Sequence, residues 1–506
     1  MNDEILVLSA PMYMEDRHCG YCKGSKQDHW ALESWSKKNK RATSVTIGMS
    51  VEQMTCQQYD ILMNKGFRRS GTFLYKPDLL RNCCRLYTIR TTLDQMKVAK
   101  QHRQVLNRFV RAISDETDEK SKGNGKTNKK FSMKSIIEAE KSSSRFHTHF
   151  EPAAFTNEKY QLYKKYQVAV HNDKESDVTP ASFKRFLCDT PFPQREVDGT
   201  KQHFETLNTW VKQWPQRPTM TNRRVGPTHE CYYLDEKLIA ISVMDFLPSG
   251  VSSVYFIWDP DYAHLSLGTL SGLRELQMCQ ELALGYYYLG YYIDDCQKMK
   301  YKGQFGGEIL DVCSGIYYPL DKVKKYIRNG RFFAINQEKS NSAELVNMSE
   351  QVFGDNAQTY SDSKQALKQL SERYSVGEPT RKSLALPDVV PGVHSFSEIL
   401  ECENRDRFPT EIMSRTRKWT VHEAAGEAKW FTHNGHANTD PTKVKKSGAG
   451  NYNWGRPGDE LEDDNEWETV HMFGKSGRRN SNHSQHEMSL RMLNEQLDNS
   501  LFSEAL

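Results

Sequence analysis

Two separated pairs of cysteines constrain the fold of this chain more than any other feature. Cys19 and Cys22 share one CGYC segment, and Cys83 and Cys84 are direct neighbours much further along. Four thiolates suit a zinc ion or an iron-sulfur cluster, and such a site would hold the two segments together in space. Neighbouring side chains diverge on an extended backbone, so the second pair can reach one ion only where the chain bends. We therefore predict a metal site, against the alternative that these are small buried residues.

The start of the chain and the number of cysteines also indicate whether these cysteines bind metal or form disulfides. The chain has 11 cysteines and begins MNDEILVL, which lacks the basic region and long apolar run of a secretory signal. We therefore expect a cytoplasmic protein, present in the nucleus as well, whose reduced cysteines bind metal rather than form disulfides. His18 and His29 are alternative ligands. No segment approaches the roughly 18 uninterrupted apolar residues of a membrane-spanning helix, so we expect no membrane partner.

Composition divides the chain into four parts. Its 506 residues exceed what one hydrophobic core usually organises. Residues 1–112 hold the cysteine pairs, which predicts a small N-terminal metal-binding and recognition domain, and residues 113–133 form a polar linker. Residues 134–375 alternate helical and strand periodicities, as expected of an α/β (α+β) catalytic domain. Residues 376–506 include a long stretch rich in Gly, Asn, Asp, Ser and Lys, and we expect this C-terminal extension to be partly disordered.

Hydrophobic periodicity predicts the main elements of the catalytic domain. Residues 158–171 have aromatic and apolar side chains at helical spacing, with Lys159, Lys164 and Lys165 facing away from the core. Leucines recur every third residue after position 267, which predicts a buried helix over 267–284 that stops at Gly285. Short apolar runs predict strands over 238–243, 253–258 and 286–293.

Basic side chains cluster near the cysteines, although the whole chain is nearly neutral. There are 69 Lys and Arg against 65 Asp and Glu, so the net charge of +4 does not by itself indicate a nucleic-acid-binding protein. The local cluster consists of Arg68, Arg69, Lys76, Arg81, Arg85 and Arg90. Arginine binds phosphate and carboxylate through paired hydrogen bonds, and aromatic rings nearby can stack on unpaired bases. The cluster therefore predicts a site for substrate anions, while any single cation is better explained as part of a solvated strand face.

Acidic residues follow two of the predicted strands. Asp259 and Asp261 follow the strand over 253–258, and Asp294 and Asp295 follow the strand over 286–293. The carboxyl ends of neighbouring parallel strands line the ligand crevice of an open sheet, so these four carboxylates would converge if the strands are neighbours. Such a surface would hold a guanidinium or accept a proton from an attacking amine. The alternative is that the first pair caps a turn.

The turn after the first acidic pair argues against coenzyme A as a donor. Acetyltransferases of the GNAT fold carry a Gln/Arg-x-x-Gly-x-Gly/Ala loop for the coenzyme A pyrophosphate, whereas residues 264–270 here read HLSLGTL. The second small residue is missing. We therefore expect no coenzyme A.

Longer motifs identify a family. Those in the first part of the chain are CGYC at 19–22, RRSG at 68–71, YKP at 75–77, CC at 83–84 and YTIR at 87–90. Those in the second part are KRFLCDTPF at 184–192, HECYY at 229–233, VSSVYFIWDPDY at 251–262, SLG at 266–268, YYYLGYYI at 286–293, CQKM at 296–299 and YKGQ at 301–304. Over roughly residues 15–330 the chain resembles the eukaryotic arginyl-tRNA-protein transferases, most closely the fungal form.

The resemblance implies a GNAT-like acyltransferase domain that uses arginyl-tRNA as donor. It implies acceptor proteins beginning with Asp or Glu, or with oxidised Cys in some members, and a product marked for ubiquitin-dependent degradation by a downstream ubiquitin ligase. It also makes Cys19, Cys22, Cys83 and Cys84 the metal site, for which zinc and an iron-sulfur cluster both remain open. We expect a monomer.

Charge and position within these motifs suggest residue roles. We predict that Arg68, Arg69 and Lys76 lie near the acceptor. The other predicted substrate-binding residues are Arg85, Arg90, Asp294 and Asp295. Asp259 is the preferred base or arginine ligand, with Asp261 and His229 as further catalytic candidates and Tyr288 and Glu230 as alternatives. Two other functions remain: another GNAT-type transferase, and a non-catalytic adaptor that binds tRNA or acidic amino termini.

Overall fold

The computed structural model describes the parts of the chain that carry most of these predictions. The described residues are 6–9, 12–16, 19–22, 26, 44–80, 82–114, 132–216, 223–313, 315–335 and 357–360. All of them lie in one compact unit, which comprises residues 1–405 and 479–493. His18, His29 and Arg81, most of the predicted linker and the whole predicted C-terminal extension lie outside the described residues.

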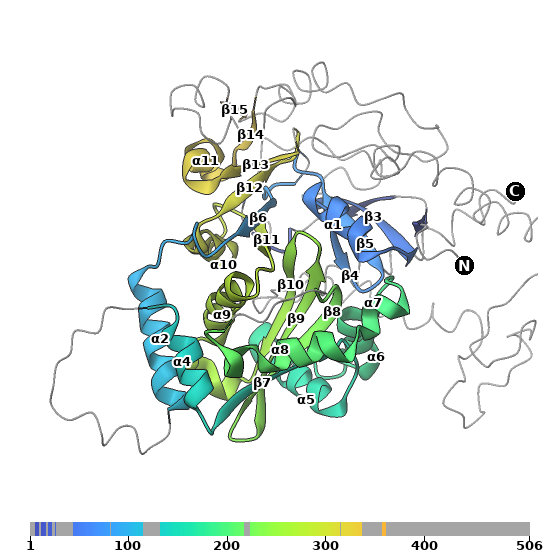
Figure 1. The fold of residues 1–506 in the computed structure, drawn as a ribbon. Helices are drawn as coiled ribbons and strands as arrows, with labels where there is room; N and C mark the ends of the chain where they lie inside the picture. The colour runs from blue at the N-terminus through green and yellow to red at the C-terminus, as the bar shows by residue number, and fades with distance from the viewer. Residues whose placement is uncertain are drawn as a thin grey trace, which may run out of the picture. The chain divides into compact units, whose positions relative to one another are not determined.

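An eight-stranded sheet forms the centre of this unit (Figure 1). Its strand order is β13 (Ile316–Pro319), β12 (Glu308–Asp311), β6 (Tyr87–Thr91), β11 (Tyr286–Tyr292), β10 (Gly250–Trp258), β9 (Lys237–Leu247), β8 (Gly226–Leu234) and β7 (Phe146–Pro152). β10 and β11 are parallel, and the other neighbouring pairs are antiparallel. The predicted mixed α/β class is confirmed.

Helix α9 (Leu267–Glu281) connects the two parallel strands and packs against both. Its predicted inward residues, Leu267, Leu270, Leu273 and Leu276, are all buried. The chain then turns at Gly285, whose φ of +90° is a conformation that favours glycine. The helix and the strands predicted on either side of it are therefore confirmed.

Helix α5 (Asn157–Tyr166) covers the opposite face of the sheet, because side chains alternate between the faces along a strand. On β9, Ile241 and Val243 belong to the apolar cluster that includes Tyr163 of α5, whereas Ser242 between them donates a 2.6 Å hydrogen bond to Glu275 of α9. α5 continues into a π-helical turn, η1 (Gln167–His171), so the predicted helix over 158–171 is confirmed.

β10 and β11 part after three residue pairs. They pair only from Gly250–Tyr286 to Ser252–Tyr288, after which β10 follows β9 and β11 follows β6. Both strands have a register shift at this point, between Ser253 and Tyr255 in β10 and between Tyr288 and Gly290 in β11. Such bulges bend a strand and redirect its side chains. The sheet therefore opens between its two parallel strands.

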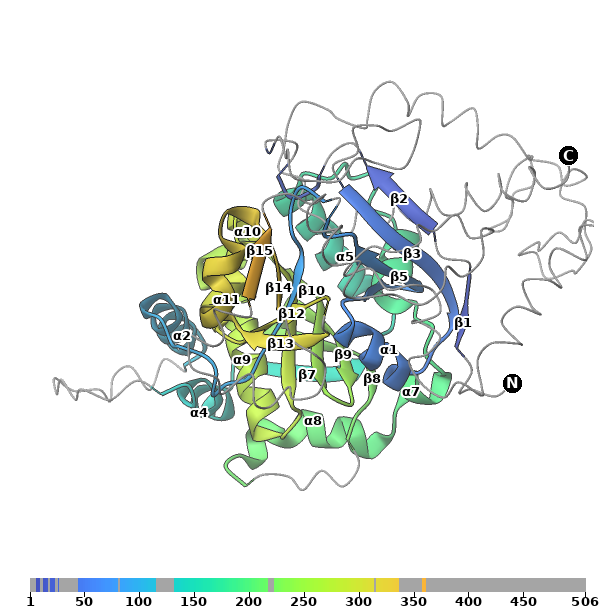
Figure 2. The same cartoon turned by 90° about the horizontal axis from the view of Figure 1, so that it is seen from above.

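A second, five-stranded sheet is built from the first part of the chain. It contains β1 (Val7–Leu8), β2 (Met12–Asp16), β3 (Ser44–Gln53), β4 (Arg68–Ser70) and β5 (Phe73–Pro77), and helix α1 (Cys56–Asn64) joins β3 to β4. Figure 2 shows β3 between β2 and β5, both of which pair with it. β6 also comes from the predicted N-terminal domain, yet it lies inside the eight-stranded sheet. Residues 1–112 thus contribute to both sheets.

The remaining elements surround these sheets. They are α2 (Lys100–Ile113), α4 (Ser135–Ser142), α6 (Pro180–Phe183), η2 (Lys184–Cys188), α7 (Gln194–Asp198), α8 (Lys201–Gln213), η3 (Pro260–Leu265), α10 (Gln297–Lys300), η4 (Tyr301–Phe305), α11 (Leu320–Ile327), η5 (Arg328–Gly330), β14 (Phe332–Ile335) and β15 (Ala357–Tyr360). None of the helices in the described part of the chain is long and apolar enough to cross a membrane.

Candidate metal centre and active site

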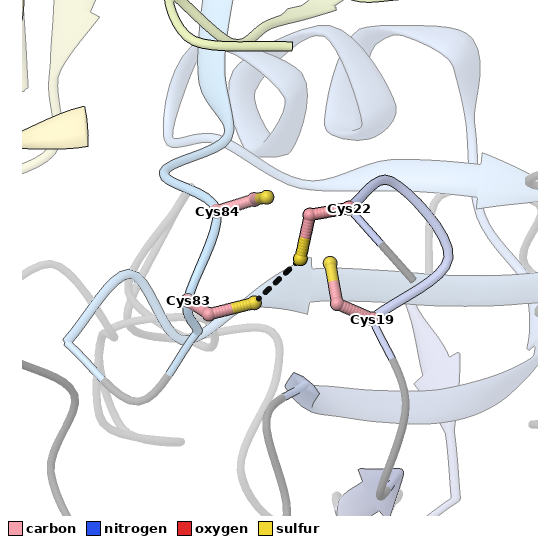
Figure 3. Close-up of side chains that lie close together, drawn as sticks. All are labelled: Cys19, Cys22, Cys83 and Cys84. Carbon is pink, nitrogen blue, oxygen red and sulfur yellow. Dashed lines mark hydrogen bonds between the residues drawn. The ribbon is translucent and has the colours of Figure 1, made fainter. Parts of the chain in front are cut away.

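The four predicted metal ligands converge. Their Sγ atoms all lie within 4.8 Å of one another, and those of Cys22 and Cys83 are 3.4 Å apart. Figure 3 shows Cys19 and Cys22 on one loop and Cys83 and Cys84 on a second segment, with the side chains directed toward one another. Cys22 is half-buried and the other three are buried. The segments that the sequence separates thus form one site between them.

This donor set fits a metal ion. Zinc–sulfur bonds of about 2.3 Å at tetrahedral angles separate the sulfur atoms by about 3.8 Å, which is compatible with the observed cluster. Hydrogen bonds with Cys19 and Cys22, together with burial, raise the pKa of Cys83 and Cys84, whereas the hydrogen bond with Cys19 lowers the pKa of Cys22. The four sulfurs therefore share protons when no cation is present. A metal ion would replace those protons, because thiolates rather than thiols are ligands.

The second predicted acidic pair lies beside the loop that carries the first cysteines. Lys26 of this loop forms an ion pair with Asp295, and Asp294 accepts a 2.8 Å hydrogen bond from the hydroxyl of Tyr292. Among the described contacts, none joins either residue to the acidic pair that follows β10. The parting of β10 and β11 explains this separation. Asp259 and Asp261 follow β10, Asp294 and Asp295 follow β11, and the two strands are no longer paired at these ends.

The first acidic pair is held by two lysines. Lys165 Nζ lies 2.6 Å from a carboxylate oxygen of both Asp259 and Asp261, and Lys237 Nζ lies 2.8 Å from Asp259. Asp259 also accepts a 3.0 Å hydrogen bond from the backbone N–H of Asp261, which caps the turn η3. Burial alone would raise the pKa of Asp259, but the hydrogen bonds from the lysines outweigh it and lower the pKa. A role as base or arginine ligand would require these lysines to move away.

His229 is fully buried on β8. Its Nδ1 lies 3.0 Å from Nζ of Lys159, and its Nε2 lies 3.0 Å from the carbonyl oxygen of Leu187. An ammonium group can only donate, so Nδ1 accepts and Nε2–H donates. Burial and the Lys159 charge lower the pKa of His229 to about 3, so the imidazole is neutral and both of its nitrogens are engaged. These contacts favour a structural role.

Lys159 itself departs from the sequence prediction. It was expected to face away from the core, but it is buried and forms a 2.5 Å ion pair with Glu151. The prediction for Lys159 is wrong because a carboxylate and an imidazole acceptor compensate its burial, and hydrophobic periodicity cannot show such partners.

The predicted alternative Glu230 also has a buried partner. Arg274 of α9 donates a hydrogen bond to Glu230 and a bidentate pair, at 2.8 and 2.7 Å, to Glu140 of α4. Burial raises the pKa of Glu230, and Arg274 opposes that shift. This network joins the helices to the sheet, and it leaves Glu230 poorly placed to serve as a base.

Arg69 is committed to a buried ion pair. Its Nε and Nη2 donate to the two carboxylate oxygens of Asp245 on β9, at 2.8 and 2.5 Å. Its Nη1 donates to the carbonyl oxygen of Gly71 at 3.0 Å, and its guanidinium lies 4.8 Å from the ring centre of Phe192. Arg69 therefore joins the small sheet to the large one, and its charge is already paired.

Arg90 is enclosed by aromatic rings. Its guanidinium carbon lies 3.7 Å from the ring centre of Tyr286 and 3.6 Å from that of Tyr317. Its Nε donates to Glu308 at 3.1 Å, and its Nη1 lies 3.4 Å from the hydroxyl of Tyr288. This arrangement places the alternative candidate Tyr288 in a network with Arg90 rather than beside the catalytic candidates after β10.

Two more cations of the predicted cluster are buried. Lys76 on β5 lies 5.5 Å from the ring centre of Phe67. Arg85 donates a hydrogen bond to the carbonyl oxygen of Asn82, directly before the second cysteine pair. Arg85 therefore supports the bent segment that carries two of the metal ligands.

Arg68 is a further buried cation, and part of its hydrogen-bonding capacity is unused. Its Nη1 donates to the carbonyl oxygens of Phe67 and Met63, at 2.7 and 3.2 Å, but its buried Nε and Nη2 have no partner. The side chain is only 6% exposed, and its guanidinium lies 5.3 Å from the ring centre of Tyr291. Arg68 therefore keeps two donors available for a ligand.

Lys302 is a candidate site residue that the sequence did not reveal. It lies in the YKGQ motif on η4, where a single lysine stands out by neither charge density nor spacing. Its Nζ lies 3.4 Å from the position that a Cβ atom would occupy on Gly290. Burial and the charge of Arg68 lower the pKa of Lys302 to about 7. The structure thus brings Lys302 to the bulge of β11, in the electrostatic field of Arg68.

Comparison with known proteins bears on what these sites do. The N-terminal model of the arginine-tRNA-protein transferase family matches residues 17–104, and its C-terminal model matches residues 158–311. Arginyl-tRNA-protein transferase 1 of Saccharomyces cerevisiae is 40% identical over 448 residues, which cover 79% of this chain and 87% of the yeast protein. The chain belongs to the arginine-tRNA-protein transferase family. It is therefore an aminoacyltransferase, and the adaptor alternative is set aside.

More distant relatives place this arginine-tRNA-protein transferase in a wider group. Arginyl-tRNA-protein transferase 2 of Arabidopsis thaliana is 24% identical over 455 residues, covering 57% of this chain and 70% of the plant protein. An aspartate/glutamate leucyltransferase of Alcanivorax borkumensis is 29% identical over 247 residues, covering 49% of this chain and 74% of the bacterial protein. The relatives thus include enzymes named for two different aminoacyl groups.

The chemistry of such a transferase demands little from its side chains. An aminoacyl ester is already activated, and a free α-amino group has a pKa of about 7.7–8, so roughly a tenth to a sixth of it is uncharged at pH 7. Alignment of the amine with the ester is the main task. No nucleophilic serine or cysteine is required. The buried cations and the opening between β10 and β11 are therefore best considered as binding and positioning features.

Proposed function

We propose that this protein transfers arginine from arginyl-tRNA to the N-terminal α-amino group of proteins that begin with Asp or Glu. The 40% identity to the yeast arginyl-tRNA-protein transferase, over 87% of that protein, carries this proposal. The bacterial relative is named for aspartate and glutamate, which supports acidic acceptors. The partly unpaired cation Arg68 is consistent with a carboxylate on the acceptor. Oxidised Cys is a further acceptor to test, because oxidation also creates an acidic side chain.

The reaction proceeds by aminolysis. The uncharged α-amine of the acceptor attacks the carbonyl carbon of the arginyl ester, an amide bond forms, and the bond to the ribose oxygen of the tRNA breaks. The proton lost by the amine is balanced by the proton gained by the departing ribose hydroxyl. The protein contributes by holding both substrates in line.

A transfer assay with matched acceptors tests this function. Peptides that begin with Asp or Asn and are otherwise identical would be incubated with labelled arginyl-tRNA, with leucyl-tRNA and acetyl-coenzyme A as alternative donors. We expect label only from arginyl-tRNA and mainly on the Asp peptide. An N-acetylated Asp peptide, which has no free α-amine, is the control. Leucine transfer, acetyl transfer or equal labelling of Asn would overturn the assignment.

We also propose that the catalytic half has a GNAT-like fold. The parallel β10–α9–β11 unit and the parting of its two strands support this proposal, because an opening between parallel strands gives an acyl group access to the middle of the sheet. The turn before α9 lacks the coenzyme A loop, in keeping with a tRNA-borne donor. An experimental structure with a non-hydrolysable arginyl-adenosine bound in this opening would support the proposal, and binding elsewhere would contradict it.

We propose that the four cysteines hold one tetrahedral zinc ion rather than an iron-sulfur cluster. The close spacing of the sulfurs, all within 4.8 Å, supports a mononuclear site, since a cluster of several irons needs its thiolates further apart. The ion would hold the CGYC loop against the second cysteine segment and so contribute to folding. Elemental analysis should give one zinc per chain, and a visible iron-sulfur absorption band would contradict this.

The cellular setting follows from the same activity. We propose a monomer in the cytoplasm and nucleus whose arginylated products are recognised by a ubiquitin ligase. Size-exclusion chromatography with light scattering tests the first point. Recognition by a ubiquitin ligase is tested by the lifetime of an Asp-initiated reporter, compared in cells with and without this protein. Equal lifetimes would contradict this recognition.

A further inference from the structure

Three buried hydrogen-bond donors without partners belong to Arg68, which packs on Tyr291 of β11, and to Tyr317, which packs on Arg90 of the neighbouring strand β6. Arg68 leaves Nε and Nη2 unpartnered, and the buried hydroxyl of Tyr317 on β13 has no partner either. Burial raises the pKa of Tyr317, and the Arg68 charge opposes this, so the hydroxyl lies in the field of the guanidinium and keeps its proton. Buried donors are nearly always satisfied in proteins, so unused donors that share one region indicate a missing acceptor.

Lys302 is a second basic group beside β11, at Gly290, which directly precedes the Tyr291 ring that Arg68 contacts. Its ammonium group lies against Gly290, whose φ of +85° belongs to the bulge of β11 and whose missing side chain leaves space for it. Within the part of the chain that the structure describes, no carboxylate forms an ion pair with Lys302 or Arg68. Lys302 as a whole residue is half-buried, whereas Arg68 and Tyr317 are buried.

Two acidic residues, Glu308 and Asp60, are already engaged by other groups. Glu308 accepts from Arg90 at 3.1 Å and from Gln95 at 2.9 Å, and Asp60 accepts two hydrogen bonds from Ser249. The charges of Arg68 and Lys302 therefore repel one another without a counter-ion from these residues. Two uncompensated cations beside a buried surface are unfavourable, and an incoming anion would remove that cost.

We propose that Arg68, Lys302 and Tyr317 bind the side-chain carboxylate of the acceptor's N-terminal residue. This inference rests on the function proposed above and names the residues that select acidic acceptors. Two free N–H groups on one guanidinium match the two oxygens of a carboxylate, and the ammonium and hydroxyl add donors to the same anion. The group lies at the bulge where β11 leaves β10, next to the opening through which the ester would be reached.

A tRNA phosphate is the competing anion. A phosphodiester belongs to a continuous backbone that tracks over exposed cations, whereas Arg68 is 6% and Tyr317 is 7% exposed. A single side chain that ends in a carboxylate suits such a recessed group better. The acceptor is therefore the favoured ligand, and the experiment separates the two anions.

Conservative variants of the whole protein test the proposal. Lys302→Gln and Arg68→Gln keep a polar but shorter side chain and remove the charge, and Tyr317→Phe removes only the hydroxyl. Lys300→Gln, at an exposed position on the adjoining helix, is the matched control. Steady-state transfer would be measured with Asp, Glu and Asn peptides, and KM for arginyl-tRNA would be measured separately. Thermal unfolding would confirm that each variant is folded.

We expect Lys302→Gln to raise KM for the Asp and Glu peptides by about 10- to 100-fold, the usual range for losing a hydrogen bond to a charged group. The value of kcat and the KM for arginyl-tRNA should stay within about twofold of the wild type, because a substrate contact remote from the reacting atoms affects binding. The Asp-to-Asn selectivity should fall by the same factor. Arg68→Gln should act in the same direction, and Lys300→Gln should change nothing.

Other outcomes would overturn the assignment. A higher KM for arginyl-tRNA, with an unchanged KM for the Asp peptide, would show that the cations read a phosphate. Unchanged selectivity in folded Lys302→Gln and Tyr317→Phe proteins would show that the group does not bind the acceptor. If the wild-type protein does not prefer the Asp peptide to the Asn peptide, the proposed function itself fails. That failure can be told apart from a failure of the residue assignment, because it is seen in the wild type without any variant.

Discussion

Removing the partner of Arg69 should destabilise the protein strongly. Asp245→Asn leaves Arg69, whose side chain is 5% exposed, without the carboxylate that accepts two of its hydrogen bonds. Breaking a buried ion pair from one side typically costs about 3–5 kcal/mol, because the remaining charge stays buried and unpaired. Whole proteins are stable by only about 5–15 kcal/mol, so the loss would be a large fraction. At about 2–4 °C per kcal/mol, the expected fall in Tm is roughly 6–20 °C.

Thermal and urea unfolding of purified protein would measure this effect. Asp321→Asn is the matched control, because its ion pair with Lys97 is exposed and 3.4 Å long, and exposed pairs contribute about 0–1 kcal/mol. Replacing both partners, as Arg69→Met with Asp245→Leu, should recover part of the stability. The reasoning is refuted if Asp245→Asn unfolds with the stability of the control but raises KM for acidic peptides, because Arg69 would then serve the acceptor rather than the fold.

Three further predictions follow from the other sites. Replacing Cys83 and Cys84 together by Ser should abolish metal binding, measured by elemental analysis, and lower Tm; retained zinc would contradict the four-cysteine site. Asp259→Asn should keep the cap, because Asn caps as well as Asp, and should lower stability by only about 0–1 kcal/mol through the lost ion pairs with two partly exposed lysines, with kcat changed less than about tenfold; a larger fall in kcat in folded protein would restore Asp259 as a catalytic group. The pKa of His229 is lowered to about 3 in the folded protein and is about 6.5 when unfolded, so the unfolded chain binds more protons between these values. Stability should therefore fall as pH drops below about 6.5, by about 2 kcal/mol at pH 5 for this residue, and His229→Gln should flatten the slope; identical pH–stability curves would contradict a buried neutral imidazole.

Several elements could be foreseen because their signals are local. The leucines of 267–284 repeat at the helical period, and the aromatic run YYYLGYYI has the length and composition of a buried strand. The structure contains α9 and β11 at these places. The four cysteines could be grouped because only a few chemical uses explain two thiol pairs in a reduced chain. In each case, the information lies in residues that are close in sequence or few in kind.

Residue roles could not be foreseen in the same way. Arg68 and Arg69 are adjacent and identical in type, yet one pairs with Asp245 and the other keeps two unused donors. Their side chains point to opposite faces of β4, but only the packing decides what each face meets. The role of Asp259 could not be foreseen either. The sequence predicts that Asp259 follows a strand, but only the structure shows that Lys165 and Lys237 pair with its carboxylate.

The amino-acid order alone was enough to predict the family, the mixed α/β class, the main helix and strands of the catalytic half and the set of cysteines that can bind metal. These follow from periodicity, from residue chemistry and from motifs that extend over a few residues. Three features became visible only in the folded chain: β6 lies inside the large sheet, β10 and β11 part at paired bulges, and Lys302 lies beside Gly290 in the field of Arg68. The physical reason is that burial and ion pairing join residues far apart in the chain, and the charge of a side chain does not state which partner it will meet.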